Sequence, residues 1–104
     1  GGLGFVPPDR ATFLGEKGVA RAFARLTRVT INCYRHGVDR VFDGDPTDIP
    51  DCLADAADDF ADKVARLVPP RSVVPACLLA NTSALTTLAN GVAQALNPIV
   101  YCAE

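Results

Sequence analysis

The amino-acid sequence predicts an all-α fold, a small bundle of three or four helices stapled by two disulfides. Apolar residues recur every three or four positions over long segments, which is typical of helices with one buried face. No segment alternates between polar and apolar residues for long enough to indicate a strand. A chain of 104 residues without a Gly/Ser-rich or charge-rich linker is expected to form one domain, residues 1–104.

Residues 1–8, with the sequence GGLGFVPP, are expected to form an extended apolar arm because the Pro pair disfavours a helix. The side chains of Leu3, Phe5 and Val6 either pack on their own domain or contact a neighbouring subunit. The sequence leaves both alternatives open.

A long helix is predicted from Glu16 to about Phe42, after a short turn that Asp9 can cap. Arginines recur along one side of this helix. His36 is expected on the surface in its last turn, where a cationic ring suits the helix dipole. The side opposite the arginines is predicted to face inward as an apolar seam of Val19, Phe23, Leu26, Thr30 and Cys33.

Residues 43–49 are rich in aspartate and in turn-forming residues, and they are predicted to be an acidic loop in which Thr47 or Asp48 caps the next helix. That helix is expected from Pro50 to Val68, where Pro69-Pro70 ends it. Aspartates occupy its exposed face. Its apolar face is predicted to hold Cys52, Ala56, Phe60, Val64 and Leu67.

The last third of the chain carries no charged side chain between Arg71 and Glu104, although 21% of all residues are charged, which indicates burial by the domain or by another molecule. Residues 72–97 are predicted to be helical, either as one helix or as two that separate near Asn81, and residues 98–104 form a tail. The core side of this segment is expected to carry Leu85, Leu88, Val92 and Leu96. A neighbouring molecule is expected to cover the opposite side and the tail, at Thr86, Thr87, Asn90, Gln94, Ile99 and Tyr101.

The chain has four cysteines, which are expected to form two disulfides. If the helices run up, down and up, the heights of the cysteines favour pairing Cys33 with Cys77 and Cys52 with Cys102. The sequential pairing, Cys33 with Cys52 and Cys77 with Cys102, becomes competitive if the first helix ends early or the third breaks. Paired structural cysteines indicate an oxidising compartment, so a secreted or periplasmic location is expected. An N-terminus without methionine agrees with the removal of a leader segment.

No catalytic signature is present in the sequence, because no Ser or Cys accompanies a His in a nucleophilic pattern and no Gly-rich phosphate loop follows a strand. We therefore expect a protein that is not an enzyme. A net charge of −2 argues against a general nucleic-acid binder, and no transmembrane segment is expected. Asp43, Asp45 and Asp48 could ligate calcium, but their spacing does not match an EF-hand, and a solvated acidic loop is preferred.

Cofactor binding is not expected. Cys33 and His36 have helical spacing, but the other cysteines lie too far away in the sequence to complete a recognisable zinc site. Axial haem ligation by His36, Tyr34 or Tyr101 is a minor hypothesis.

These observations favour a non-enzymatic structural subunit of an extracellular homo-oligomer or filament, whose partners are copies of itself. The basic first helix and the acidic second helix could stack copies head to tail, or could form pairs within one molecule. A second hypothesis is a secreted carrier of a small apolar ligand, such as a lipid or a haem-like molecule. A third is a secreted protein-interaction or inhibitor module. The cavity of the carrier would be lined by Phe23, Phe60, Leu85 and Leu88.

Overall fold

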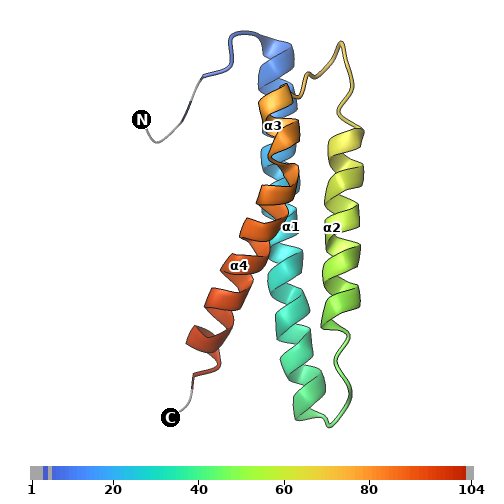
Figure 1. Cartoon of the computed structure of the whole chain (residues 1–104), viewed down its shortest axis with the longest axis vertical. Coiled ribbons are helices and arrows are strands. Elements are labelled where there is room, and N and C mark those ends of the chain that lie inside the picture. The colour runs from blue at the N-terminus through green and yellow to red at the C-terminus, as the bar shows by residue number, and fades with distance from the viewer. Residues whose placement is uncertain (1–3, 5, 103–104) are drawn as a thin grey trace.

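The computed structural model of the chain describes residues 4 and 6–102. These residues form four helices, and no strand is found in this part of the chain. The helices are α1 (Arg10–Phe42), α2 (Ile49–Ala65), α3 (Ala76–Ala80) and α4 (Thr82–Val100). The helices α1 and α2 lie side by side and run in opposite directions, and α3 and α4 follow one another along a line that crosses α1 (Figure 1). The predicted all-α class is confirmed.

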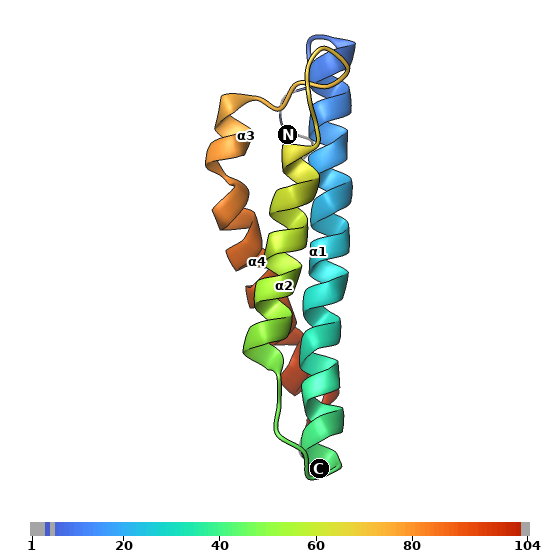
Figure 2. The ribbon, with the colours of Figure 1, turned by 90° about the vertical axis from the view of Figure 1, so that its right-hand side faces the viewer.

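The molecule is elongated because the 33 residues of α1 alone span about 50 Å at the usual rise per residue. Its extents are 52 × 29 × 17 Å, and its radius of gyration is 16.4 Å. A compact domain of this length would have a radius of gyration of about 13 Å. In the second view, α3 leans away from α1 while α4 crosses behind α2, so α1 and α2 form a straight pair with α4 laid obliquely over α1 (Figure 2). An arrangement of this kind leaves much of α4 facing outward.

Helix α1 begins six positions earlier than predicted because Asp9 caps it directly. The backbone amide of Thr12 donates a hydrogen bond of 2.8 Å to the Asp9 carboxylate, and this bond lowers the pKa of Asp9. The helix ends at Phe42, as predicted. Its inward seam is confirmed at four positions, Val19, Leu26, Thr30 and Cys33, all of which are buried. Phe23 is half-buried and packs against the edge of the core.

Two buried glycines let other segments approach α1 closely. A Cβ atom at Gly15 would collide with the backbone of Val73, whose amide donates a 2.8 Å hydrogen bond to the Ala11 carbonyl. A Cβ atom at Gly37 would collide with the side chain of Ile49 at the start of α2. The segment before α3 and the start of α2 therefore lie directly against α1 at these two glycines. Gly37 lies within α1 and does not end the helix.

Helix α2 buries the predicted apolar face through Ala56, Phe60 and Val64, which join the core against α1. It ends at Ala65, three residues before the predicted end, and the cap is Arg66. Asp48 occupies the N-cap position as predicted, but its side chain makes no capping hydrogen bond in the structure.

The third helical segment is divided at Asn81, which confirms the two-helix alternative. Its first part begins at Ala76 instead of Ser72, because Val73 is drawn into the hydrogen bond with α1 described above. Its second part continues through Pro98 to Val100, beyond the predicted end at residue 97.

The core side of α4 differs from the prediction. Ala89 and Ala93 are 0% and 1% exposed against α1, whereas Leu88 is 55% exposed and Val92 is 43% exposed. Leu96 is also exposed, so of the four predicted core residues only Leu85 packs against the core. The small alanine side chains allow α4 to lie close to α1, which turns the larger side chains outward.

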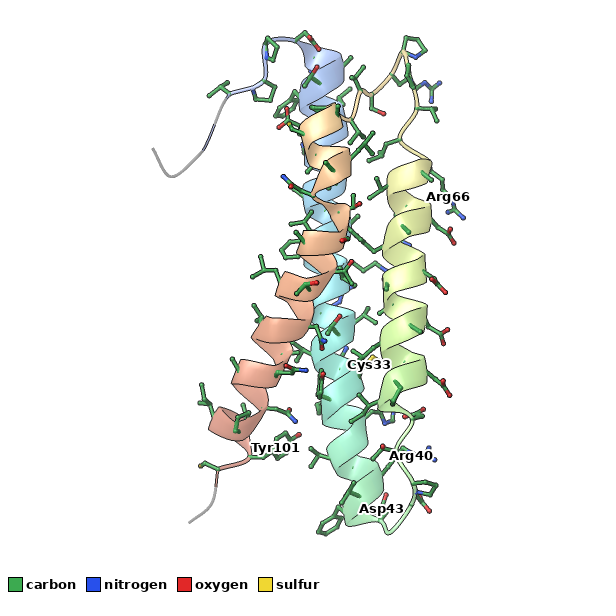
Figure 3. All side chains as sticks on the ribbon, in the orientation of Figure 1. Cys33, Arg40, Asp43, Arg66 and Tyr101 are labelled. Carbon is green, nitrogen blue, oxygen red and sulfur yellow. A yellow bond between two sulfur atoms is a disulfide. The ribbon has the colours of Figure 1, made fainter. Side chains whose placement is uncertain are left out.

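The favoured disulfide pairing is wrong. Cys33 is bonded to Cys52, with their Cα atoms 5.7 Å apart, and this is the only disulfide in the described residues, which include all four cysteines. The loop after α1 turns at Asp43 and runs back along α1, where the Arg40 side chain donates a hydrogen bond to a loop carbonyl. Helix α2 consequently begins beside Cys33 and not at the end of α1 (Figure 3).

The other two cysteines, Cys77 and Cys102, are unpaired and exposed. They lie at opposite ends of the α3–α4 segment, 25 residues apart, which corresponds to about 37 Å at the usual rise of a helix. A disulfide requires Cα atoms within about 7 Å, so these two cysteines cannot bond to one another within one folded molecule.

Candidate interaction surface

The outward side of α4 is apolar and uncharged. Leu88 and Val92 are exposed here, and Ile99 is 72% exposed one turn before the end of the described chain. Three small exposed residues, Ala84, Gly91 and Ala95, lie on the same side of the helix as these larger side chains. We define the outer α4 face as six exposed residues, Ala84, Leu88, Gly91, Val92, Ala95 and Ile99. Single exposed apolar residues are common, but a continuous apolar row along a helix is typical of an interaction surface.

Two polar residues of α4, Asn90 and Gln94, contact α1, although Gln94 remains exposed. The Tyr34 hydroxyl of α1 donates a hydrogen bond of 2.7 Å to the Asn90 side-chain oxygen and accepts one of 3.0 Å from the Gln94 amide. Asn90 is half-buried in this contact. These bonds orient α4 about its axis, because they fix which of its sides meets α1.

Two further predicted contact residues, Thr86 and Thr87, use their hydroxyl groups within α4. Thr86 donates to the Thr82 carbonyl at 3.3 Å, and Thr87 donates to the Ser83 carbonyl at 3.1 Å. The polar groups predicted to meet a neighbour are thus engaged with their own chain. The outer α4 face shares Ile99 with the predicted contact residues and otherwise consists of other exposed residues.

The remaining predicted contact residues are exposed where they are described. Ile99 belongs to the outer α4 face, and Tyr101 beside it is 45% exposed. Val6 in the N-terminal arm is 80% exposed. Leu3 and Phe5 lie outside the described residues.

An open apolar groove of about 420 Å³ runs between α2 and the α3–α4 segment. It exists because α2 and α4 both pack along α1 while diverging from one another (Figure 1). Its walls include Ala57, Phe60 and Val64 from α2, and Leu79, Thr82 and Thr86 from the other side. This groove is not the predicted cavity, with which it shares Phe60 alone, since Phe23 and Leu85 pack onto the core and Leu88 faces solvent.

Charged residues of α1 and α2 pair across the boundary between the two helices. Asp59 accepts a hydrogen bond of 2.7 Å from Lys63 and one of 3.2 Å from Arg25. The Lys63 bond is the larger cause and the Arg25 bond the second cause of a lowered pKa at Asp59. The basic and acidic stripes therefore flank one another here, which favours pairing within the molecule over electrostatic stacking of copies.

The calcium hypothesis gains no support from the geometry. Asp43, Asp45 and Asp48 are all exposed in the acidic loop. No group of three or more His, Cys, Asp or Glu side chains in residues 4 and 6–102 is placed to hold a metal ion. His36 is exposed, as predicted, and the Tyr34 hydroxyl is engaged by α4.

None of the helices in the described ranges combines the length and the hydropathy needed to cross a membrane. Comparison of the chain with protein-family models, with curated proteins and with solved structures finds no match.

Proposed function

We propose that this chain is a non-enzymatic structural subunit that assembles with copies of itself, as a homo-oligomer or filament, outside the cell or in the periplasm. The observation that carries the proposal is the outer α4 face, an exposed apolar row on a helix without a single charged side chain. Water-facing helices normally carry charged residues on their outer side, as α1 and α2 do. The absence of charge on α4 suits contact with another apolar surface.

The accessible surface of the chain also supports assembly. It amounts to 7292 Å². A globular monomer of 10.9 kDa is expected to expose about 5,600 Å². The difference is about 1,700 Å², and a stable interface covers about 800 Å² on each partner. The elongated molecule therefore has ample surface for an interface.

The Cys33–Cys52 disulfide supports the proposed compartment. Structural disulfides persist in oxidising environments and are rare where thiols are kept reduced. It joins α1 to α2 and leaves the outer α4 face accessible to a partner.

The test compares two leucines of similar exposure on different sides of the α3–α4 segment. Leu88 on the outer face is 55% exposed, and Leu79 in the groove is 51% exposed. The oligomeric state of the wild type, L88D and L79D is measured by light scattering over a range of protein concentrations at physiological salt. Circular dichroism confirms that each variant is helical.

The wild type is expected to associate, and L88D is expected to need at least about tenfold more protein for the same association, because a buried carboxylate is costly. L79D is expected to associate like the wild type. A wild type that remains a monodisperse monomer at high concentration would refute the proposal. Equal loss of association in both variants would place the contact elsewhere.

A second candidate function is the binding of a small apolar ligand, which the groove between α2 and the α3–α4 segment favours. A volume of about 420 Å³ with mainly apolar walls falls in the size range of ligand sites. Native mass spectrometry separates the two functions, since a bound ligand adds a small mass while self-association multiplies the mass. The carrier function predicts an added mass that L79D loses and L88D keeps.

A further inference from the structure

We propose that the partner of the outer α4 face is a second copy of this chain, packed antiparallel along α3 and α4 and joined to it by two disulfides between Cys77 of each copy and Cys102 of the other. This inference rests on the proposed self-assembly and specifies its geometry. A two-fold contact of this kind closes with two copies, so the unit that forms is a dimer.

The positions of the two free cysteines are the first argument. Both are exposed, and both lie beyond each other's reach within one molecule. The α3–α4 segment is interrupted at Asn81, and Cys102 follows the end of α4, so Cys77 lies near the start of the segment and Cys102 just beyond its end. In an antiparallel pair of helices, one end of each segment meets the opposite end of the other. At each end of the pair, Cys77 of one copy then lies beside Cys102 of the other copy.

The residues between the cysteines fit the same register. Placing Cys77 level with Cys102 of the second copy also places Leu88 level with Gly91 of the second copy, so a large side chain meets a position without one. The same register sets Ala84 against Ala95, and two small residues allow the helices to approach closely. All of these residues are exposed.

Gly91 has no explanation within its own chain. A Cβ atom at this position would have nothing within 4 Å, and glycine in a helix interior is destabilising. The other helical glycines differ, since a Cβ atom at Gly15, Gly18 or Gly37 would collide with a neighbouring segment. Contact with Leu88 of a second copy would give Gly91 the close neighbour that the other three have.

Charge and area together suggest why the pairing would be covalent. No charged residue lies between positions 72 and 103, so two copies can approach without repulsion between charges on this segment. The paired segment is about 37 Å long and about 10 Å wide, which gives a footprint of roughly 400 Å² on each copy. That is about half the area of a typical stable interface on one partner. The two disulfides compensate for the small area.

Formation of the bonds is ordinary thiol–disulfide exchange with an oxidant of the disulfide class, either a small molecule or a protein. One cysteine thiolate attacks the oxidant and forms a mixed disulfide, and one thiol leaves. The thiolate of the second cysteine then displaces the other half of the oxidant as a second thiol. Each protein disulfide thus consumes two cysteine thiols and one oxidant disulfide, which accepts two electrons and two protons.

The test uses two single variants, C77S and C102S, oxidised with glutathione disulfide separately and as an equimolar mixture. In the antiparallel register neither variant can cross-link to itself, because its remaining cysteines lie at opposite ends of the pair. The mixture can form one bond, between Cys102 of the first variant and Cys77 of the second. Non-reducing electrophoresis detects the dimer, and mass spectrometry of the undigested and digested product identifies the bond.

A covalent dimer in the wild type and in the mixture, with neither variant alone dimerising, would support the inference. Covalent dimers of C77S alone or C102S alone would show pairing between like cysteines and would overturn the antiparallel register. No covalent dimer in the wild type would overturn the inference as a whole. Light scattering of the double variant C77S/C102S, which can form neither bond, then decides separately whether the proposed self-assembly survives without the disulfides.

The register itself is tested by G91L in the wild-type background, with A24L on the exposed side of α1 as the matched control. G91L is expected to slow dimer formation about tenfold, because a leucine at this position would clash with Leu88 of the second copy. A24L is expected to leave the rate unchanged. Equal rates for G91L and the wild type would refute the proposed contact.

Discussion

Reduction of the Cys33–Cys52 disulfide should destabilise the fold by an amount that follows from the length of the closed loop. The two cysteines are 19 positions apart in the sequence. The chain-entropy relation gives an entropy of about 11 cal/mol/K for a loop of this length, which is about 3 kcal/mol at 25 °C. A domain of this size typically has a free energy of unfolding of about 5–15 kcal/mol, so the bond would contribute a substantial part of it.

The assay is urea unfolding followed by circular dichroism, with and without reductant. The C77A/C102A variant is used because reductant then acts at Cys33 and Cys52 alone. A loss of about 3 kcal/mol should lower the urea midpoint by about 1–3 M at the m-values usual for small proteins. The double variant C33A/C52A should cost more than reduction, because the Cys33 side chain is 1% exposed and its sulfur fills space in the core. A loss below about 1 kcal/mol with an unchanged m-value would refute the loop-closure reasoning.

Three further predictions concern single positions. In the C77A/C102A background, which keeps the Cys33–Cys52 disulfide, G15A should lower the free energy of unfolding by about 1–3 kcal/mol because its methyl group would displace Val73. G91A should raise the free energy of unfolding by about 0.5–1 kcal/mol, and urea unfolding measures both. Y34F should cost about 1 kcal/mol by the same measurement, because two hydrogen bonds to α4 are lost, and no change would contradict their role in orienting that helix. The lowered pKa of Asp59 stabilises the folded state above the ordinary value of 3.8, and this stabilisation is lost as the pH falls through the lower folded pKa. D59N should therefore melt at a lower temperature than the wild type at neutral pH, and the difference should disappear in strong acid.

The inward sides of α1 and α2 could be predicted because each of these helices has charged residues on one side only. Hydropathy alone then identifies the buried seam, which includes Leu26 of α1 and Phe60 of α2. Helix α4 gives no such contrast, because both of its sides are uncharged. The larger side chains of Leu88 and Val92 suggested the core side, but the close crossing with α1 selects Ala89 and Ala93.

The orientation of α4 and the disulfide pairing could not be predicted from the sequence, because both depend on contacts between residues far apart in the chain. Tyr34 in α1 hydrogen-bonds to Asn90 and Gln94 on the side of α4 that meets α1, and nothing in the local pattern of α4 indicates this partner. Cys33 meets Cys52 because the intervening loop runs back along α1. Gly91 could have indicated the outer α4 face from the sequence, because a glycine in the middle of a helix usually has a packing or functional reason.

Both α2 and α4 pack on α1 and have little contact with one another, so the local stabilities of these two helices are separable. Helix α2 is tethered to α1 by a covalent bond, while α4 is held to α1 by packing and by the Tyr34 contacts. Native-state hydrogen exchange should consequently show the amides of α4 opening at a lower free energy than those of α1 and α2. Substitutions at the α1–α2 contact and at the α1–α4 contact should change stability nearly additively where they are distant and share no partner. A dimer formed through α4 would protect the amides of the least protected helix, so exchange rates of α4 would report on assembly directly.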